Sequence, residues 1–123
     1  MSLVLVDTSV WIDHLHRSDK RLTTLLESNL VVSHPMIVGE LALGTMRDRA
    51  TVLGLLARLP AAPVATSDEV RALIESRRLY GRGLSLVDVS LLASALIGGD
   101  VVLFTRDRRL AEAAAELAVR WNG

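Results

Sequence analysis

The chain has 123 residues, half of them apolar, and its 14 basic side chains balance its 14 acidic ones. This length suits a single domain over residues 1–123, and the absence of cysteine excludes a disulfide framework, a thiolate zinc site and a cysteine nucleophile. Without cysteine nothing points to an oxidising compartment, so we expect a cytoplasmic protein. No apolar stretch reaches the roughly 20 residues of a membrane span. Zero net charge argues against binding nucleic acid through bulk positive charge.

The first half of the chain alternates strand and helix patterns. Short apolar runs without a polar face predict buried strands, and leucines at helical spacing predict helices. The expected elements are a strand over Leu3–Val6, a helix after Asp7, a helix around Leu22–Leu26, a strand over Leu30–Ser33, and helices over Pro35–Gly44 and Arg47–Leu59.

The second half continues the alternation. Its clearest strand is Val101–Phe104, and its most apolar helix is Leu86–Ile97. The other expected elements are a weak edge strand over Ala62–Ala65, a helix over Ser67–Tyr80, a loop at Gly81–Gly83, a helix over Arg108–Leu117 and a short strand over Ala118–Trp121.

This alternation predicts an α/β fold, a three-layer α/β/α sandwich with a mostly parallel central sheet. Ligands of such sheets bind at the carboxyl ends of the strands, near the point where the strand order reverses. Asp7 directly follows the first strand, and Asp107 lies three residues beyond the end of the strand at Phe104. Both acids are therefore expected near a ligand site.

Four carboxylates stand out by their context: Asp7, Glu40, Asp88 and Asp107. Asp7 and Asp107 could each simply cap a helix, and Asp88 could form a capping box with Ser85. However, the helix that carries Asp88 is apolar nearly all round, so its carboxylate is expected to be buried with it.

Glu40 has apolar neighbours on a helix that shows almost no polar face, so a solvated position is not expected. The remaining structural alternative is a buried ion pair with an arginine such as Arg47. Two acids that follow strands and two on sheet-packing helices could converge at one end of the sheet.

Converging carboxylates raise one another's pKa values, and a hard divalent cation such as Mg²⁺ or Mn²⁺ would compensate their charge. Two such ions roughly 4 Å apart support hydrolysis of a phosphodiester. The expected metal ligands are Asp7, Asp88 and Asp107. The hydroxyls of Ser9 and Thr105 could orient a carboxylate or a water, or could cap locally.

Arginine makes up thirteen of the fourteen basic residues, and only four aromatic residues are present to stack on bases. The cluster of Arg106, Arg108 and Arg109 lies beside Asp107 and is expected to bind substrate phosphate. Its alternative is a solvated helix face.

Four segments, in order along nearly the whole chain, resemble PIN-domain ribonucleases, particularly the VapC toxins of bacterial toxin–antitoxin pairs. They are Leu3–Asp13, Val38–Gly44, Leu86–Ala93 and Leu103–Asp107. The resemblance implies a catalytic acidic quartet of Asp7, Glu40, Asp88 and Asp107 that binds Mg²⁺ or Mn²⁺ and cleaves RNA, with Thr105 as the hydroxyl beside the fourth acid.

The resemblance also implies a homodimer and a VapB-type antitoxin whose C-terminal segment occupies the acidic groove. The sequence departs from many relatives at Arg109 and Leu110, where they carry another acid and an aromatic residue. That departure puts in doubt a fifth carboxylate and full occupancy of a second metal site.

Other function classes lack their signatures. A phospho-acceptor receiver domain needs a lysine after a late strand, and the one lysine is Lys20. Neither a dinucleotide-binding nor a phosphate-loop glycine motif is present. The open alternative is a catalytically weak PIN-like module that binds RNA or a protein partner without cleavage.

Overall fold

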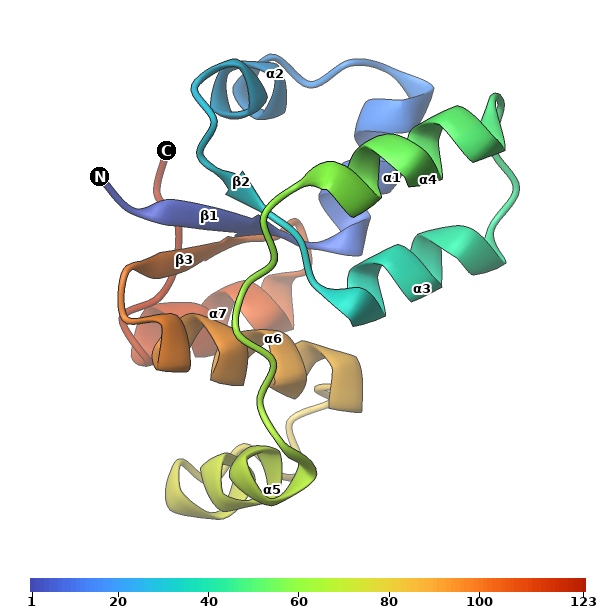
Figure 1. The fold of residues 1–123 in the computed structure, drawn as a ribbon. Helices are drawn as coiled ribbons and strands as arrows, with labels where there is room; N and C mark the ends of the chain where they lie inside the picture. The colour runs from blue at the N-terminus through green and yellow to red at the C-terminus, as the bar shows by residue number, and fades with distance from the viewer.

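The computed structural model describes all 123 residues, and at its centre lies a parallel sheet of three strands (Figure 1). The strands are β1 (Leu3–Val6), β2 (Val31–Val32) and β3 (Val101–Phe104), in the order β2-β1-β3. Val4 lies opposite Val31 on one side and Val102 on the other. Single parallel bridges from Ser33 to Ala61 and from Leu103 to Arg120 extend the two edges.

Seven helices connect and flank the strands. They are α1 (Thr8–His16), α2 (Lys20–Glu27), α3 (Pro35–Leu43), α4 (Arg49–Arg58), α5 (Ser67–Ser76), α6 (Leu86–Gly98) and α7 (Arg108–Glu116). In Figure 1, α1, α2 and α4 lie above the strands, and α5, α6 and α7 lie below them. The predicted α/β/α sandwich with a parallel sheet is therefore confirmed.

The strand order places a switch point beside β1. The chain moves from β1 outward to β2, then returns across the sheet to β3 on the other side of β1. The carboxyl ends of β1 and β3 consequently lie side by side, with connections leaving toward opposite faces. Open α/β sheets bind ligands at such a crevice.

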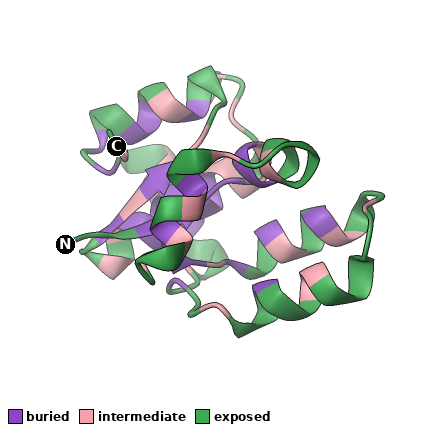
Figure 2. Cartoon of the chain, turned by 90° about the horizontal axis from the view of Figure 1, so that it is seen from above, coloured by how far each residue is buried: buried purple, intermediate pink, exposed green.

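The core explains why the strands have no polar face. Leu5, Val6 and Leu103 are fully buried, because helices cover both sides of the sheet (Figure 2). Seven consecutive residues of α6, Val89–Ala95, are buried as well. The all-round apolar pattern of this helix thus reflects its packing between the sheet and α5.

Several predicted boundaries were wrong. The edge strand expected at Ala62–Ala65 is reduced to the bridge at Ala61, because Pro60 and Pro63 have no N–H to donate to a ladder. The helix expected to reach Tyr80 ends at Ser76, and Arg78 turns the chain at a φ of 52°. Helix α4 begins at Arg49 instead of Arg47, since Asp48 has a left-handed backbone.

The expected strand over Ala118–Trp121 is likewise reduced, to the bridge at Arg120. No helix is both long and apolar enough to cross a membrane.

Candidate active site

Asp7 ends β1 and precedes α1, and its carboxylate is buried, with 7% of the residue exposed. Its backbone N–H donates to the Phe104 carbonyl at 2.8 Å, which ties the ends of β1 and β3 together. Its side chain makes no capping bond to α1, so helix capping does not explain this acid. Instead, Asp7 Oδ2 accepts hydrogen bonds from the hydroxyls of Ser9 and Thr105, each at 2.8 Å.

Both hydroxyls also hold the loop that follows β3. Ser9 Oγ accepts the N–H of Arg106 at 3.1 Å, and Thr105 Oγ1 accepts the N–H of Asp107 at 3.0 Å. Each hydroxyl therefore joins the Asp7 carboxylate to the backbone of this loop. Ser9 and Thr105, the hydroxyl residues predicted to support the site, therefore hold the Asp7 carboxylate where two segments distant in sequence meet.

Asp88 lies in the first turn of α6, where it forms the predicted capping box with Ser85. The Ser85 N–H donates to Asp88 Oδ2 at 2.9 Å, and the Asp88 N–H donates to Ser85 Oγ at 3.0 Å. Desolvation by burial raises the pKa of Asp88 above its usual value. The hydrogen bonds with Ser85 oppose this shift, and the charges of Asp7 and Asp107 add to it. Asp88 is half-buried rather than fully buried.

Asp107 caps α7, because its Oδ1 accepts the Leu110 N–H at 2.9 Å. The capping interpretation is therefore correct for this residue, and its second carboxylate oxygen makes no hydrogen bond within the chain. Because its charge also acts on Asp88, Asp107 belongs to the same electrostatic cluster as Asp7 and Asp88. One carboxylate oxygen holds the helix, and the other remains available to a ligand.

Glu40 is exposed on α3, which corrects the expectation that it could not be solvated. Only Ile37 and Leu41 of this helix are buried, so apolar neighbours in sequence did not mean burial. Glu40 makes no ion pair with Arg47; Thr8 Oγ1 donates to Glu40 Oε1 at 2.7 Å. Since Thr8 follows Asp7, this contact brings Glu40 to the same end of the sheet.

The three arginines expected to bind phosphate differ in their contacts. Arg106 pairs with Asp13 at 3.1 Å and also with Asp19, so it is held within the protein. Arg108 pairs with Glu112 one turn along α7. The Arg109 side chain packs against Gly83, where an added Cβ would lie 2.6 Å from Arg109 Nη1. Arg109 makes no ion pair.

Asp19 is a structural acid near the site that the sequence interpretation missed. It caps α2 by accepting the N–H groups of Arg21 and Leu22, and it anchors Arg106. Although desolvation by burial raises its pKa, these hydrogen bonds and the charge of Arg21 bring the pKa below its usual value. An acid before a helix pattern signals the cap, but no local pattern signals a partner 87 residues away.

The donor set suits a hard divalent cation. Asp7, Asp88 and Asp107 offer carboxylate oxygens. Burial, and to a smaller extent the charges of Asp7 and Asp107, raise the pKa of Asp88, and a bound cation would oppose both effects. No three acidic or histidine side chains lie close enough together to enclose an ion. Proteins usually hold Mg²⁺ through one or two carboxylates while it keeps several waters, so binding of this ion does not need all three acids in direct contact with it.

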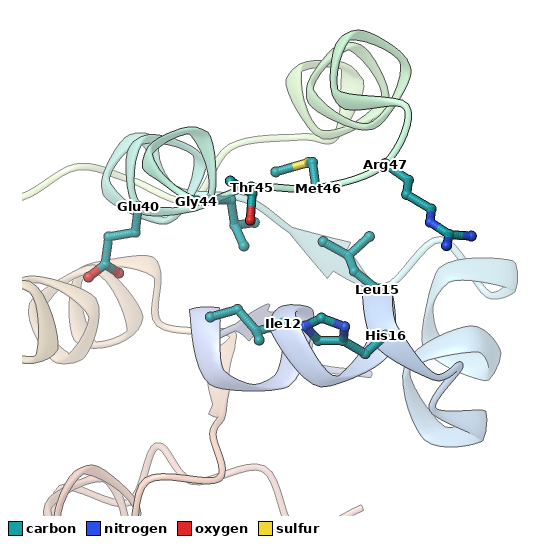
Figure 3. A pocket seen from close by; sticks show the side chains of 9 residues that line it. Ile12, Leu15, His16, Glu40, Gly44, Thr45, Met46 and Arg47 are labelled. Atoms are coloured by element: carbon teal, nitrogen blue, oxygen red, sulfur yellow. The ribbon is translucent and has the colours of Figure 1, made fainter.

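A groove of about 650 Å³ opens next to this cluster, between α1 and the segment that joins α3 to α4 (Figure 3). Ile12 and Leu15 of α1 face Met46 across it, and Arg47 lies at one end. Glu40 lines the other end, so the groove leads toward the acidic cluster. The arrangement combines a carboxylate site with an adjoining groove that both apolar and polar residues line.

Comparison with known proteins agrees with this geometry. The PIN domain family profile matches residues 4–116. The chain is also 50% identical over 117 residues to "Ribonuclease VapC32" from each of two strains of Mycobacterium tuberculosis, an alignment that covers 95% of this chain and 94% of each relative. From its fold, its cluster of acids at the switch point and these matches, the chain belongs to the PIN domain family.

Proposed function

We propose that this protein is a metal-dependent endoribonuclease that hydrolyses RNA phosphodiester bonds and acts as the toxin of a toxin–antitoxin pair. The observation that carries the proposal is the buried Asp7 carboxylate at the switch point, which two hydroxyls fix against the loop that bears Asp107. Burial, and then the charges of Asp7 and Asp107, raise the pKa of Asp88, so a bound cation would stabilise the ionised form of that carboxylate. The similarity to a protein named ribonuclease supports RNA as the substrate.

In this proposal one or two of Asp7, Asp88 and Asp107 bind Mg²⁺ or Mn²⁺ directly, and the others interact with it through its bound waters. When bound, the ion supplies charge stabilisation and a lowered pKa for water. Ser9 and Thr105 fix the direction of the Asp7 carboxylate. Glu40, which is exposed and accepts a hydrogen bond from Thr8, would accept a proton from the attacking water in this proposal. Arg109, which has no acidic partner, is the arginine of its cluster that remains free to contact substrate phosphate.

We further propose that a VapB-type antitoxin silences the enzyme by lying along the groove beside Glu40. The apolar side chains of Ile12, Leu15 and Met46 suit the apolar face of a partner segment. A basic side chain at the end of that segment would meet the acidic cluster. Occupation of the groove would thus block access to the carboxylates.

We also propose a homodimer that works in the cytoplasm, where its RNA substrate is found. Met36, Gly39 and Leu43 lie on one face of α3, with Leu43 90% exposed and open space beside Gly39. An uncovered apolar face of this kind favours association. Light scattering of the purified protein should give the mass of two chains.

The function is tested with purified protein freed of any partner and incubated with RNA and Mg²⁺ or Mn²⁺. We expect cleavage that stops with EDTA and in Asp7→Asn and Asp88→Asn. Asp68→Asn, a change at an exposed acid in the first turn of α5, is the control and should cleave normally. Undiminished cleavage by either site variant would refute the site, and RNA binding without cleavage would favour a non-catalytic module.

Expression without the antitoxin should also arrest bacterial growth. Normal growth of cells that contain folded, metal-binding protein would contradict the toxin role.

A further inference from the structure

The loop that joins α5 to α6 packs against α7 through two neighbouring residues. Arg82 pairs with Glu116, the last residue of α7, at 2.5 Å. Gly83, the next residue of the loop, contacts the side chain of Arg109 in the first turn of the same helix. Arg109 and Glu116 are seven residues apart, about two helical turns, so they share one face of α7 and the loop lies along that face.

The contact between Gly83 and Arg109 needs glycine. A Cβ added at Gly83 would lie 2.6 Å from Arg109 Nη1, 3.0 Å from Cζ and 3.2 Å from Cδ, so the contact runs from the aliphatic stem to the guanidinium. Gly83 also has a φ of 76°, in the left-handed region that favours glycine. A larger residue here would displace the Arg109 side chain, since a long side chain moves more easily than the backbone.

The loop that supports Arg109 is itself held at both ends. Leu79 is buried, and its N–H donates to the Ile74 carbonyl at 3.0 Å. Leu84 packs partly buried against the core. Together with the pair from Arg82 to Glu116, these contacts fix the position of Gly83. Arg109 is exposed to solvent but rests on a defined surface.

The supported side chain lies between the two helices that carry acids of the site. Arg109 follows Asp107 by two residues, and Gly83 precedes Ser85 by two residues. Ser85 caps α6 and bonds to Asp88. The Arg109 side chain therefore reaches from the start of α7 to the segment just before α6. A guanidinium there offers a phosphate two parallel N–H donors next to the carboxylates.

We propose that Gly83 is a positioning residue that holds the Arg109 guanidinium beside the acidic cluster before RNA arrives, so that a phosphate of the substrate meets an arginine already in place. A free arginine would have to be ordered during binding, at a cost in affinity that a supported one avoids. The inference rests on the proposed ribonuclease function and adds to it the residue that determines where Arg109 meets the substrate.

The first test uses the protein without RNA and measures NMR relaxation of the arginine Nε–H groups. Arg109 should have a higher order parameter than Arg77, an exposed arginine at the end of α5. Gly83→Ala should lower the order parameter of Arg109 to that of Arg77. An Arg109 as mobile as Arg77 in the native protein would refute the inference, whatever the protein does to RNA.

The second test compares Gly83→Ala with Gly81→Ala. Gly81 has a φ of 71°, and no atom lies within 4 Å of a Cβ added there. Both variants therefore place a methyl group on a left-handed backbone in the same loop, but only Gly83→Ala displaces Arg109. By fluorescence anisotropy in EDTA, Gly83→Ala should bind a labelled single-stranded oligoribonucleotide about 2-fold to 10-fold more weakly than Gly81→Ala, the cost of ordering one long side chain.

The third test asks whether the effect acts through Arg109. Arg109→Gln should weaken binding and reduce the slope of log affinity against log salt by about 0.7, the value for one phosphate contact on a single strand. In the Arg109→Gln background, Gly83→Ala should weaken binding no more than Gly81→Ala does. A full effect of Gly83→Ala in that background would refute the positioning role.

The outcomes separate this inference from the function on which it rests. Circular dichroism shows whether each variant is folded; if Gly83→Ala is not, the native order parameter of Arg109 and the binding of Arg109→Gln decide the inference. If the native protein cleaves RNA but Gly83→Ala binds it as tightly as Gly81→Ala, the positioning role is refuted and the nuclease function stands. A native protein that neither binds nor cleaves RNA would refute both proposals.

Discussion

The hydroxyl of Thr105 is one of two donors that share Asp7 Oδ2. Thr105→Val keeps the shape of the side chain and removes this donor, so the carboxylate should lose its fixed orientation. We expect a loss of about 10-fold to 100-fold in Mn²⁺ affinity or cleavage rate, which is typical of residues that orient metal ligands. Calorimetric titration and initial rates measure the two effects.

Thr105→Ser restores the donor and should recover most of the Mn²⁺ affinity. A valine variant with native affinity and rate would show that the hydroxyl does not position Asp7.

Asp88→Asn should change stability and activity in opposite directions. The pKa of Asp88 is raised in the folded protein, so its ionised form opposes folding at neutral pH, and the neutral amide removes that cost. The Asn side chain can still accept the Ser85 N–H. We expect higher resistance to urea in EDTA at pH 7 together with loss of cleavage. Lower resistance to urea would show that the ionised Asp88 stabilises α6 by more than its burial and the neighbouring acids destabilise the folded protein.

At the level of single residues, sequence reasoning located the acids but not their surroundings. Asp7 could be placed because a strand end in a parallel sheet is fixed by topology. Glu40 was misjudged because burial of a helix depends on what packs against it, and α3 buries only the face that carries Ile37 and Leu41. Arg106 was assigned to substrate, since its partners Asp13 and Asp19 become neighbours only in the folded chain.

Among the elements, α3 begins with an unusual cap. His34 is 1% exposed, and its Nδ1 accepts the Met36 N–H at 3.1 Å, which leaves the ring proton on Nε2 without a partner. Burial lowers the pKa of His34 below its usual 6.5. Protonation would both charge a buried ring and remove the acceptor that caps the helix carrying Glu40.

The sign of the pH effect follows from this shift. The contribution of His34 to stability is complete above pH 6.5, its value in the unfolded chain, and is lost as the pH falls toward the lowered folded value. His34→Asn keeps a capping acceptor and does not titrate, so it should flatten the stability profile between about pH 5 and 7. Urea unfolding at several pH values measures this.

His16→Asn changes an exposed histidine and should keep the native pH profile. An unchanged profile in His34→Asn would contradict the role of the buried ring.

Helix α7 ends in a turn that suits glycine better than the residue present. Ala118 has a φ of 59°, and the N–H of Val119 bonds to the Ala114 carbonyl at 2.8 Å. Ala118→Gly removes the strain of a left-handed Cβ and should stabilise the protein by about 0.5–1 kcal/mol. Thermal unfolding measures the effect.

Ala115→Gly, three residues earlier and still within α7, should destabilise by about 1 kcal/mol. The same substitution should therefore have opposite signs at the two positions. Destabilisation at both would show that the turn at Ala118 carries no strain.

Element types were predictable because apolar period and capping residues are local signals. Strand ends and sheet edges were not, since they depend on a partner. The bridges at Ala61 and Arg120 exist only because Ser33 and Leu103 lie opposite them. The end of α5 was also missed, because an arginine at Arg78 gives no sign of a left-handed turn.

For the whole molecule, a net charge of zero hides two separate populations of charge. In the proposed function, metal would compensate the acids of the site, and the arginines without an acidic partner, such as Arg109, would contact RNA phosphate. With about three phosphate contacts, log affinity should fall with log salt at a slope of about −2. Titrations of a single-stranded oligoribonucleotide across salt concentrations measure it. A slope several times steeper would indicate binding through bulk charge instead.

The bond from Thr105 to Asp7 joins residues 98 positions apart, and β3 enters the sheet beside the first strand of the chain. During synthesis, Asp7 therefore cannot bond to Thr105 or lie beside β3 until nearly the whole chain has left the ribosome. An unfinished or truncated chain that ends before residue 101 lacks β3, Thr105 and Asp107 together. Under the proposed function, the chain therefore has no complete nuclease site until β3 has entered the sheet.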